Sequence, residues 1–164
     1  MIHYQVRPLR PQAHLFQVTL TIDRPTPEGQ GLTLPAWIPG SYMIRDFARH
    51  IISLEASAGG APVDVAKLDK QTWQLAPTDG PVTVRYQVYA WDLSVRGAHL
   101  DTAHGYFNGS CLFLAAMGFA DQPCGVYLEA PDLPASPARH LAPGLHRARC
   151  PPPGPPPLRA RDYA

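Results

Sequence analysis

The chain has 164 residues, of which 45% are hydrophobic and 16% are charged, and its formal net charge is +1 at pH 7. This length suits one domain with a sizeable hydrophobic core. The small net charge and the lack of any run of Lys or Arg argue against a nucleic-acid-binding protein. The sequence also has no long apolar stretch and begins with the alternating segment MIHYQVRPLR, so we expect neither a membrane span nor a secretory signal, and a cytoplasmic location.

Alternation of hydrophobic and polar residues predicts strands along most of the chain. In residues 14–23, every second residue from Phe16 to Ile22 is hydrophobic and the residues between them are polar. This period of two is typical of a half-buried strand. The strands expected on such patterns are residues 3–9, 14–23, 32–38, two short strands within 53–76 around a Gly-Gly turn, 81–93, 111–117 and 124–131. With a single helical turn expected at 44–51, these short strands predict an all-β fold, an antiparallel β-sandwich.

The composition changes from about Pro134 onwards. The last thirty residues are rich in Pro, Arg and Ala, and many of the 20 prolines lie there. Such a segment buries too little apolar surface to offset the entropy lost on ordering. We therefore expect one β-sandwich domain over residues 1–133 and an irregular linker or disordered tail over 134–164. A truncated or frameshifted gene product is an alternative explanation of this ending.

The three cysteines do not suggest a disulfide-built fold. Their number is odd and their spacing is irregular. Cys111 opens the apolar run CLFLAAM, so we expect a buried thiol there in preference to a disulfide with Cys124.

The segment HLDTAH is the best local candidate for a metal site. On a strand, His99 and Asp101 share one face and His104 does not, so a common ion requires a turn after Asp101, which Gly105 permits. Imidazole and carboxylate groups are zinc ligands, but three of them in a loop are not a distinctive set. We favour a hydrogen-bonded loop, with metal binding as the alternative.

A charged cluster stands out within LPAWIPGSYMIRDFARHI, residues 34–51. Arg45, Asp46, Arg49 and His50 are expected to form a salt-bridged turn, with Arg45 and Arg49 on one helical face. A serine-hydrolase triad of Ser41, Asp46 and His50 is a less favoured alternative, because a triad is defined by geometry.

The neighbouring aromatic residues and the segment YFNGS also have structural interpretations. We expect Trp37, Tyr42 and Phe47 to pack in the core or at a sheet edge. The Asn-Gly pair at Asn108 is suited to a tight hairpin turn.

Four blocks in order, LPAWIPGSYMIRDFARHI, KLDKQTW at 67–73, VYAWDLSVRGAHLD at 88–101 and GYFNGSCLFL at 105–114, resemble a known family. They are similar to the amino-terminal domain of the glycyl aminopeptidase family of zinc metallopeptidases, peptidase family M sixty-one. The resemblance covers roughly residues 3–133. It implies a β-sandwich domain that precedes a thermolysin-like catalytic domain, often followed by a PDZ domain.

The resemblance places the zinc ligands and the catalytic glutamate of the family in the catalytic domain. None of the seven histidines here is followed by Glu, so the zinc-binding motif HEXXH is absent. We therefore expect no catalytic residue and no cofactor in this chain, and a catalytic metallopeptidase domain as its partner. The residues expected to border a shared peptide-substrate cleft or the domain interface are Tyr42, Arg45, Asp46, Arg49, His50 and Asn108.

Two further functions remain open on the sequence. One is a free-standing β-sandwich module that binds peptides or proteins through the same surface. The other is a small metal-dependent enzyme that uses the HLDTAH segment. A bare interface would also favour a homodimer.

Overall fold

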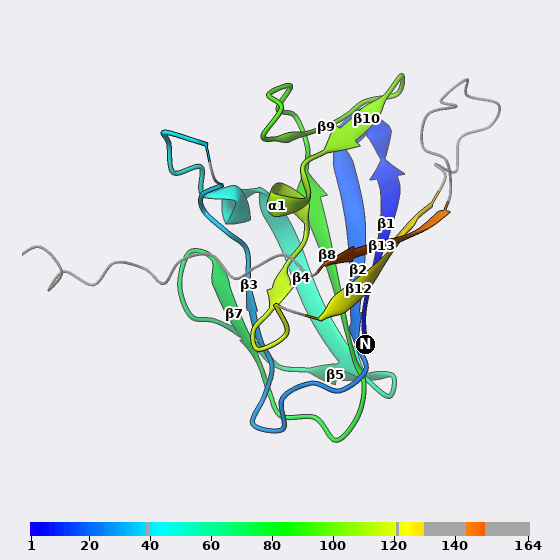
Figure 1. Cartoon of the computed structure of the whole chain (residues 1–164). Helices are drawn as coiled ribbons and strands as arrows, with labels where there is room; N and C mark the ends of the chain where they lie inside the picture. Colours follow the sequence, from blue (N-terminus) through cyan, green and yellow to red (C-terminus); the bar gives the residue numbers. More distant parts are fainter. Residues whose placement is uncertain (39, 121, 130–143, 150–164) are drawn as a thin grey trace, which may run out of the picture.

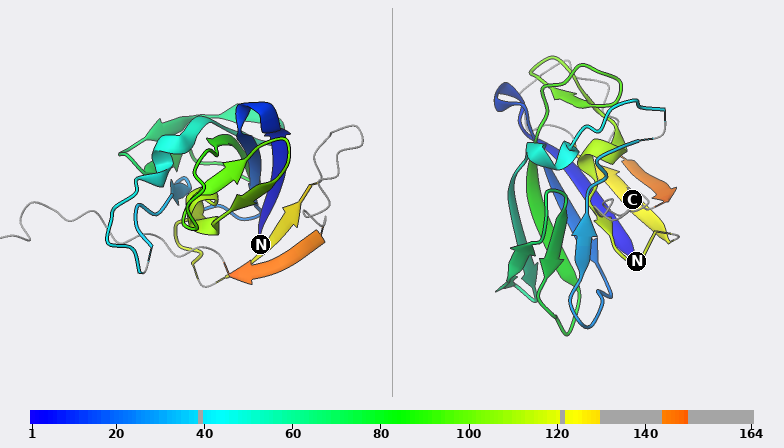
Figure 2. Two further views of the ribbon diagram at one scale, coloured as in Figure 1. Left: turned by 90° about the horizontal axis from the view of Figure 1, so that it is seen from above. Right: turned by 90° about the vertical axis from the view of Figure 1, so that its left-hand side faces the viewer.

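The computed structural model describes residues 1–38, 40–120, 122–129 and 144–149, the last range by its backbone alone. Two β-sheets face each other across a hydrophobic core, and a two-stranded hairpin lies at one end of this sandwich (Figures 1 and 2). The predicted all-β sandwich is therefore confirmed. In the described ranges, no helix is long and apolar enough to cross a membrane.

The larger sheet has seven strands in the order β13-β12-β1-β2-β8-β4-β5. Its neighbouring strands are antiparallel, except for β1 and β12, which are parallel. The strands are β1 (Ile2–Arg10), β2 (Leu15–Ile22), β4 (Ile51–Ala58), β5 (Ala61–Val63), β8 (Val82–Tyr89), β12 (Pro123–Leu128) and β13 (Gly144–Arg149).

The smaller sheet has four strands in the order β11-β3-β7-β6. Leu32, Trp73 and Leu75 of this sheet are buried in the common core. The strands are β3 (Gly31–Thr33), β6 (Val65–Lys67), β7 (Thr72–Leu75) and β11 (Ala115–Ala116). The separate hairpin consists of β9 (Ala98–Leu100) and β10 (Gly105–Phe107), and the short helices are η1 (Pro11–Ala13), η2 (Phe47–His50) and α1 (Gly109–Leu112).

Several details differ from the sequence-based expectations. The strand expected at 32–38 ends at Thr33, and β4 to β7 are four strands where two were expected within 53–76. Residues 111–117 were expected to form a strand, but α1 occupies the start of this run and only Ala115–Ala116 pair, because α1 packs against η2 and the core. Asn108 does not form a hairpin turn, since its side chain caps α1 by accepting a hydrogen bond from the Ser110 amide. Residues 144–149, expected to belong to an irregular tail, form β13, because the free edge of β12 supplies backbone partners.

The rest of the predicted tail, residues 134–143 and 150–164, and the domain boundary at residue 133 lie outside the described residues. The prediction for the thiol of Cys111 is confirmed, because Cys111 is a buried free cysteine. Burial raises the pKa of the Cys111 thiol to about 12.

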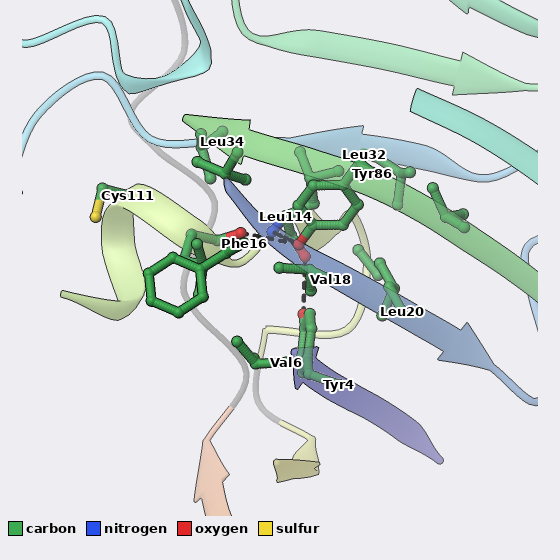
Figure 3. Packing of buried hydrophobic residues seen from close by; sticks show 14 of the residues in the cluster. Tyr4, Val6, Phe16, Val18, Leu20, Leu32, Leu34, Tyr86, Cys111 and Leu114 are labelled. Carbon is green, nitrogen blue, oxygen red and sulfur yellow. Dashed lines mark hydrogen bonds between the residues drawn. The ribbon is translucent and has the colours of Figure 1, made fainter. Parts of the chain in front are cut away.

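Two buried tyrosines hold the segment after α1 against the larger sheet (Figure 3). The Tyr86 hydroxyl donates a hydrogen bond to the Leu112 carbonyl at 2.9 Å and accepts one from the Leu114 amide at 3.1 Å. The Tyr4 hydroxyl donates to the Leu114 carbonyl at 2.8 Å. Burial raises the pKa of Tyr86, so its hydroxyl stays protonated and remains a donor at neutral pH. Backbone groups in the core are thereby paired without a strand partner.

Replacing Tyr86 with Phe should destabilise the fold by about 1–3 kcal/mol, because the Leu112 carbonyl and the Leu114 amide then lose a buried partner. Urea unfolding followed by tryptophan fluorescence measures this free energy. Tyr89→Phe is the matched control, since Tyr89 lies on the same strand with 40% of its surface exposed. The control should stay within about 0.5 kcal/mol of the wild type. Equal losses in the two variants would contradict this role of Tyr86.

Candidate functional site

The segment that follows β3 forms a projecting loop, described at residues 36–38 and 40–46. The Arg45 amide donates to the Ala36 carbonyl at 2.7 Å and closes the base of the loop. Inside it, the Trp37 indole N–H donates to the Ser41 carbonyl at 2.7 Å, and the Ser41 hydroxyl donates to the Met43 carbonyl at 3.0 Å. These local bonds satisfy polar groups within the loop, so its side chains are free to face solvent.

A second loop, residues 92–97, connects the end of β8 to the β9–β10 hairpin. Asp92 starts it by accepting a hydrogen bond from the Ser94 amide at 2.8 Å. The Tyr106 hydroxyl lies 2.9 Å from the Asp92 carbonyl, and the Asn108 amide donates to the Gly97 carbonyl at 2.9 Å. A Cβ at Gly97 would lie 2.5 Å from Asp92 Oδ2, so the turn requires glycine here.

One hydrogen bond joins the two loops. Arg96 Nη2 donates to the Gly40 carbonyl at 3.1 Å, across 56 residues of sequence. Both loops lie at the same end of the sandwich, and in the right-hand view of Figure 2 the first projects outward. Together they carry exposed apolar side chains, which we call the tip surface: Trp37, Tyr42, Met43, Ile44, Leu93 and Val95.

Tyr42 was expected to pack in the core or at a sheet edge, and this prediction is wrong. Its side chain is fully exposed, whereas Phe47 is buried in the core. Trp37 is partly exposed, with its indole N–H satisfied within the loop. The difference arises because residues 36–46 leave the sheet, so the alternation of a strand no longer decides which side chains are buried.

The charged cluster does not form the expected helical turn. η2 begins at Phe47, so Arg45 lies outside it and shares no helical face with Arg49. Asp46 pairs with Lys70 at 3.8 Å instead of with either arginine. Arg49 donates from Nε to His50 Nε2 at 3.2 Å. The carboxylate of Asp46 therefore ties the first loop to the turn between β6 and β7.

Electrostatic contacts link Arg45 and His50 to the second loop. Burial lowers the pKa of His50 and the charge of Arg49 lowers it further, against the opposing effect of Asp92. Burial acts to raise the pKa of Asp92, but hydrogen bonds from Ser94 and the charges of Arg45 and His50 bring it below its usual value. Asp92 is therefore a carboxylate at neutral pH, and the buried Nε of Arg45 has no hydrogen-bond partner among the described residues.

The alternative serine-hydrolase triad receives no support from the geometry. The Ser41 hydroxyl bonds within its own loop, Asp46 faces Lys70, and His50 contacts Arg49. Among the described residues, no hydrogen bond joins any two of the three proposed triad members. Without such contacts, neither a nucleophile nor its base is set up.

The turn after Asp101 that a shared ion would require is present in the β9–β10 hairpin. Asp101 accepts hydrogen bonds from the amides of Ala103 and His104, at 2.7 and 2.8 Å. His99 Nε2 lies 3.0 Å from Asp101 Oδ2, and His104 Nδ1 lies 3.3 Å from Oδ1. The expected hydrogen-bonded loop is thus observed, and it brings all three candidate ligands together.

The sequence analysis missed Asp92, Arg96 and Tyr106, which position the second loop and tie it to the first. A local signal exists for Asp92, because Asp-x-Ser is suited to a turn closed by the carboxylate. The bonds made by Arg96 and Tyr106 follow from tertiary placement and have no local signal.

Replacing Arg96 with Ala should expose the first loop to proteolysis, because the bond to Gly40 is lost. A hydrogen bond contributes a net stabilisation of about 0.5–1.5 kcal/mol. When cleavage is proportional to the fraction of molecules whose loop has opened, losing the bond makes chymotrypsin cleavage near Tyr42 about 2- to 10-fold faster. Mass spectrometry of timed digests measures the rate. Arg85→Ala, a substitution of an exposed residue on β8, is the matched control and should leave the rate unchanged. An unchanged rate in Arg96→Ala would show that the bond does not hold the loop.

Comparisons with known proteins agree with this architecture. The family model described as Peptidase M61 N-terminal domain matches residues 3–149. The crystal structure of an aminopeptidase N family protein from Idiomarina loihiensis matches with 46% sequence identity and a TM-score of 0.83 over 92% of this chain. The match spans 27% of that protein's chain. No match is found among curated proteins. Since the family model covers most of the sequence, the chain belongs to the family of Peptidase M61 N-terminal domains.

Proposed function

We propose that this chain is the non-catalytic N-terminal domain of an aminopeptidase-type zinc metallopeptidase, and that its tip surface packs on the catalytic domain beside the substrate cleft. The observation that carries the proposal is the exposure of six large apolar side chains on two hydrogen-bonded loops, in a chain that corresponds to 27% of a solved aminopeptidase N family protein. Large apolar side chains that are exposed together at one end of a domain suit an interaction site.

The tip surface has the make-up of a domain interface. Tyr42, Met43 and Ile44 are more than 60% exposed, although the loop backbone is tied at its base and to Arg96. Burial of such side chains on a preformed loop costs little additional backbone entropy. Charged residues follow the exposed apolar residues in sequence: Arg45 and Asp46 come after Ile44, and Arg96 comes after Val95, a mixture that suits the polar rim of a protein interface.

Two acceptor groups beside the tip surface suit the free amine of a peptide substrate. The Asp46 carboxylate is 41% exposed and pairs with Lys70 at 3.8 Å. Asn108 lies next to the second loop, where its backbone amide donates to the Gly97 carbonyl. Its side-chain oxygen caps α1 and has a second lone pair that could accept from the amine. A carboxylate or amide oxygen is a natural partner for an ammonium group. The zinc and the nucleophilic water would be supplied by the catalytic domain, in line with the absence of HEXXH from this sequence.

A hybrid protein tests this proposal, with the present chain replacing the matched region of the Idiomarina loihiensis protein. We expect the hybrid to hydrolyse glycyl or alanyl amides if the parent enzyme does, and the chain alone not to do so. In the hybrid, Ile44→Asp should weaken the domain contact by about 1.5–3 kcal/mol, because a buried isoleucine is lost. Calorimetry should then resolve separate unfolding transitions for the two domains.

Tyr127→Asp, on β12, is the matched control in the hybrid, because Tyr127 is 42% exposed on the polar face of the larger sheet, away from the loops. It should leave the hybrid's unfolding unchanged. Hydrolysis by the chain alone would contradict a non-catalytic role, and an Ile44→Asp hybrid that unfolds like the control would place the interface elsewhere. Sedimentation of the chain alone measures whether it forms a homodimer. A homodimer that forms through the tip surface should dissociate in Ile44→Asp.

A further inference from the structure

We propose that the β9–β10 hairpin is a binding site for a divalent late transition-metal ion such as Zn²⁺, held by His99, Asp101 and His104. One ligand atom from each residue can be chosen so that all three lie within 4.8 Å of one another. Two imidazoles and a carboxylate form a ligand set that suits Zn²⁺ and Co²⁺ and leaves coordination positions for water.

The position of His99 is fixed before any ion binds. The residue is 2% exposed, and its ring lies between Trp91, with centroids 4.7 Å apart, and His104, at 5.0 Å. Backbone pairing with Tyr106 on one side and with Trp91 on the other holds its strand in place. A buried ligand on paired strands loses little freedom on binding, so the site is partly preorganised.

The carboxylate of Asp101 is similarly oriented. Its Oδ1 accepts hydrogen bonds from two amides of the turn, while Oδ2 faces His99 Nε2 at 3.0 Å. A carboxylate held by its own hydrogen bonds is the arrangement found around metal ligands.

His104 provides the open side of the site. Its side chain is 56% exposed, whereas that of His99 is 3% exposed. Ligand atoms around a tetrahedral zinc ion, at about 2.0–2.2 Å from it, lie closer together than 4.8 Å. The exposed imidazole of His104 can make this adjustment, and an ion can enter from the solvent beside it.

The hydrogen bonds of the His99 ring bear on how tightly the ion is held. Its buried Nδ1 has no hydrogen-bond partner among the described residues, so the ring proton resides on Nε2, where Asp101 accepts it. An ion at Nε2 displaces this proton to Nδ1, where the described part of the chain offers no acceptor. The missing partner weakens the site, and we expect a loosely held, exchangeable ion in place of a structural one.

Calorimetric titration of the metal-free full chain with ZnCl₂ at pH 7.5 tests the proposal. We expect the wild-type chain to bind one equivalent of Zn²⁺. In His104→Ala and in Asp101→Asn, this equivalent should be lost or be bound at least about tenfold more weakly. Zn²⁺ should also raise the melting temperature of the wild type more than that of either variant. Because Asn keeps an oxygen for the turn amides and His104 is exposed, both variants should fold, as circular dichroism can verify.

His3→Ala is the matched control, an exposed histidine outside the hairpin, and should bind Zn²⁺ as the wild type does. Co²⁺ titration adds a spectroscopic measurement, since ligand-field bands of His99 and His104 coordination should appear in the wild type and disappear in His104→Ala. Two results would overturn the proposal. One is the absence of any saturable equivalent in the wild type, and the other is an equivalent that persists unchanged in both variants.

Discussion

The hydrogen bonds of the buried Tyr86 hydroxyl are the interaction on which the loop-bearing end of the molecule depends. The hydroxyl pairs with the backbone on both sides of Phe113, where the chain has left α1 and has not yet reached β11. Unpaired amide and carbonyl groups in a core are costly, so a strand partner or a side chain must satisfy them. Tyr86 allows the chain to cross the core without a strand, and this places α1 beside η2.

A series of contacts leads from this hydroxyl to the surface. Asn108 caps the start of α1, and its backbone amide donates to the carbonyl of Gly97 in the second loop. From that loop, Arg96 reaches the carbonyl of Gly40 in the first. The tip surface is thus exposed on loops that are anchored to the core, and its exposure does not follow from loose packing. Anchored apolar side chains of this kind lose little entropy when a partner covers them.

The larger sheet could be predicted from sequence because burial there follows the strand period. Phe16 to Ile22 and Val82 to Val88 alternate in the sequence and are buried in the same alternation in the structure. The secondary structure of residues 111–117 could not be predicted in this way, because a short run of apolar residues has no periodicity that separates a helix from a strand. The His99, Asp101 and His104 group was recognisable because its members are neighbours in sequence, whereas the bond from Arg96 to Gly40 spans 56 residues and has no local pattern.

The position of the tip surface finally depends on the backbone of Asp46. Its φ of 44° lies in the left-handed region, which Asp tolerates better than most residues because its short side chain can bond locally or to a neighbour. On the two sides of this residue, Ile44 is exposed to solvent and Phe47 is buried in the core. The exposed pair with Lys70, at 3.8 Å, contributes little to holding this conformation. A residue with strained backbone therefore separates the side chains that build the core from those that remain exposed.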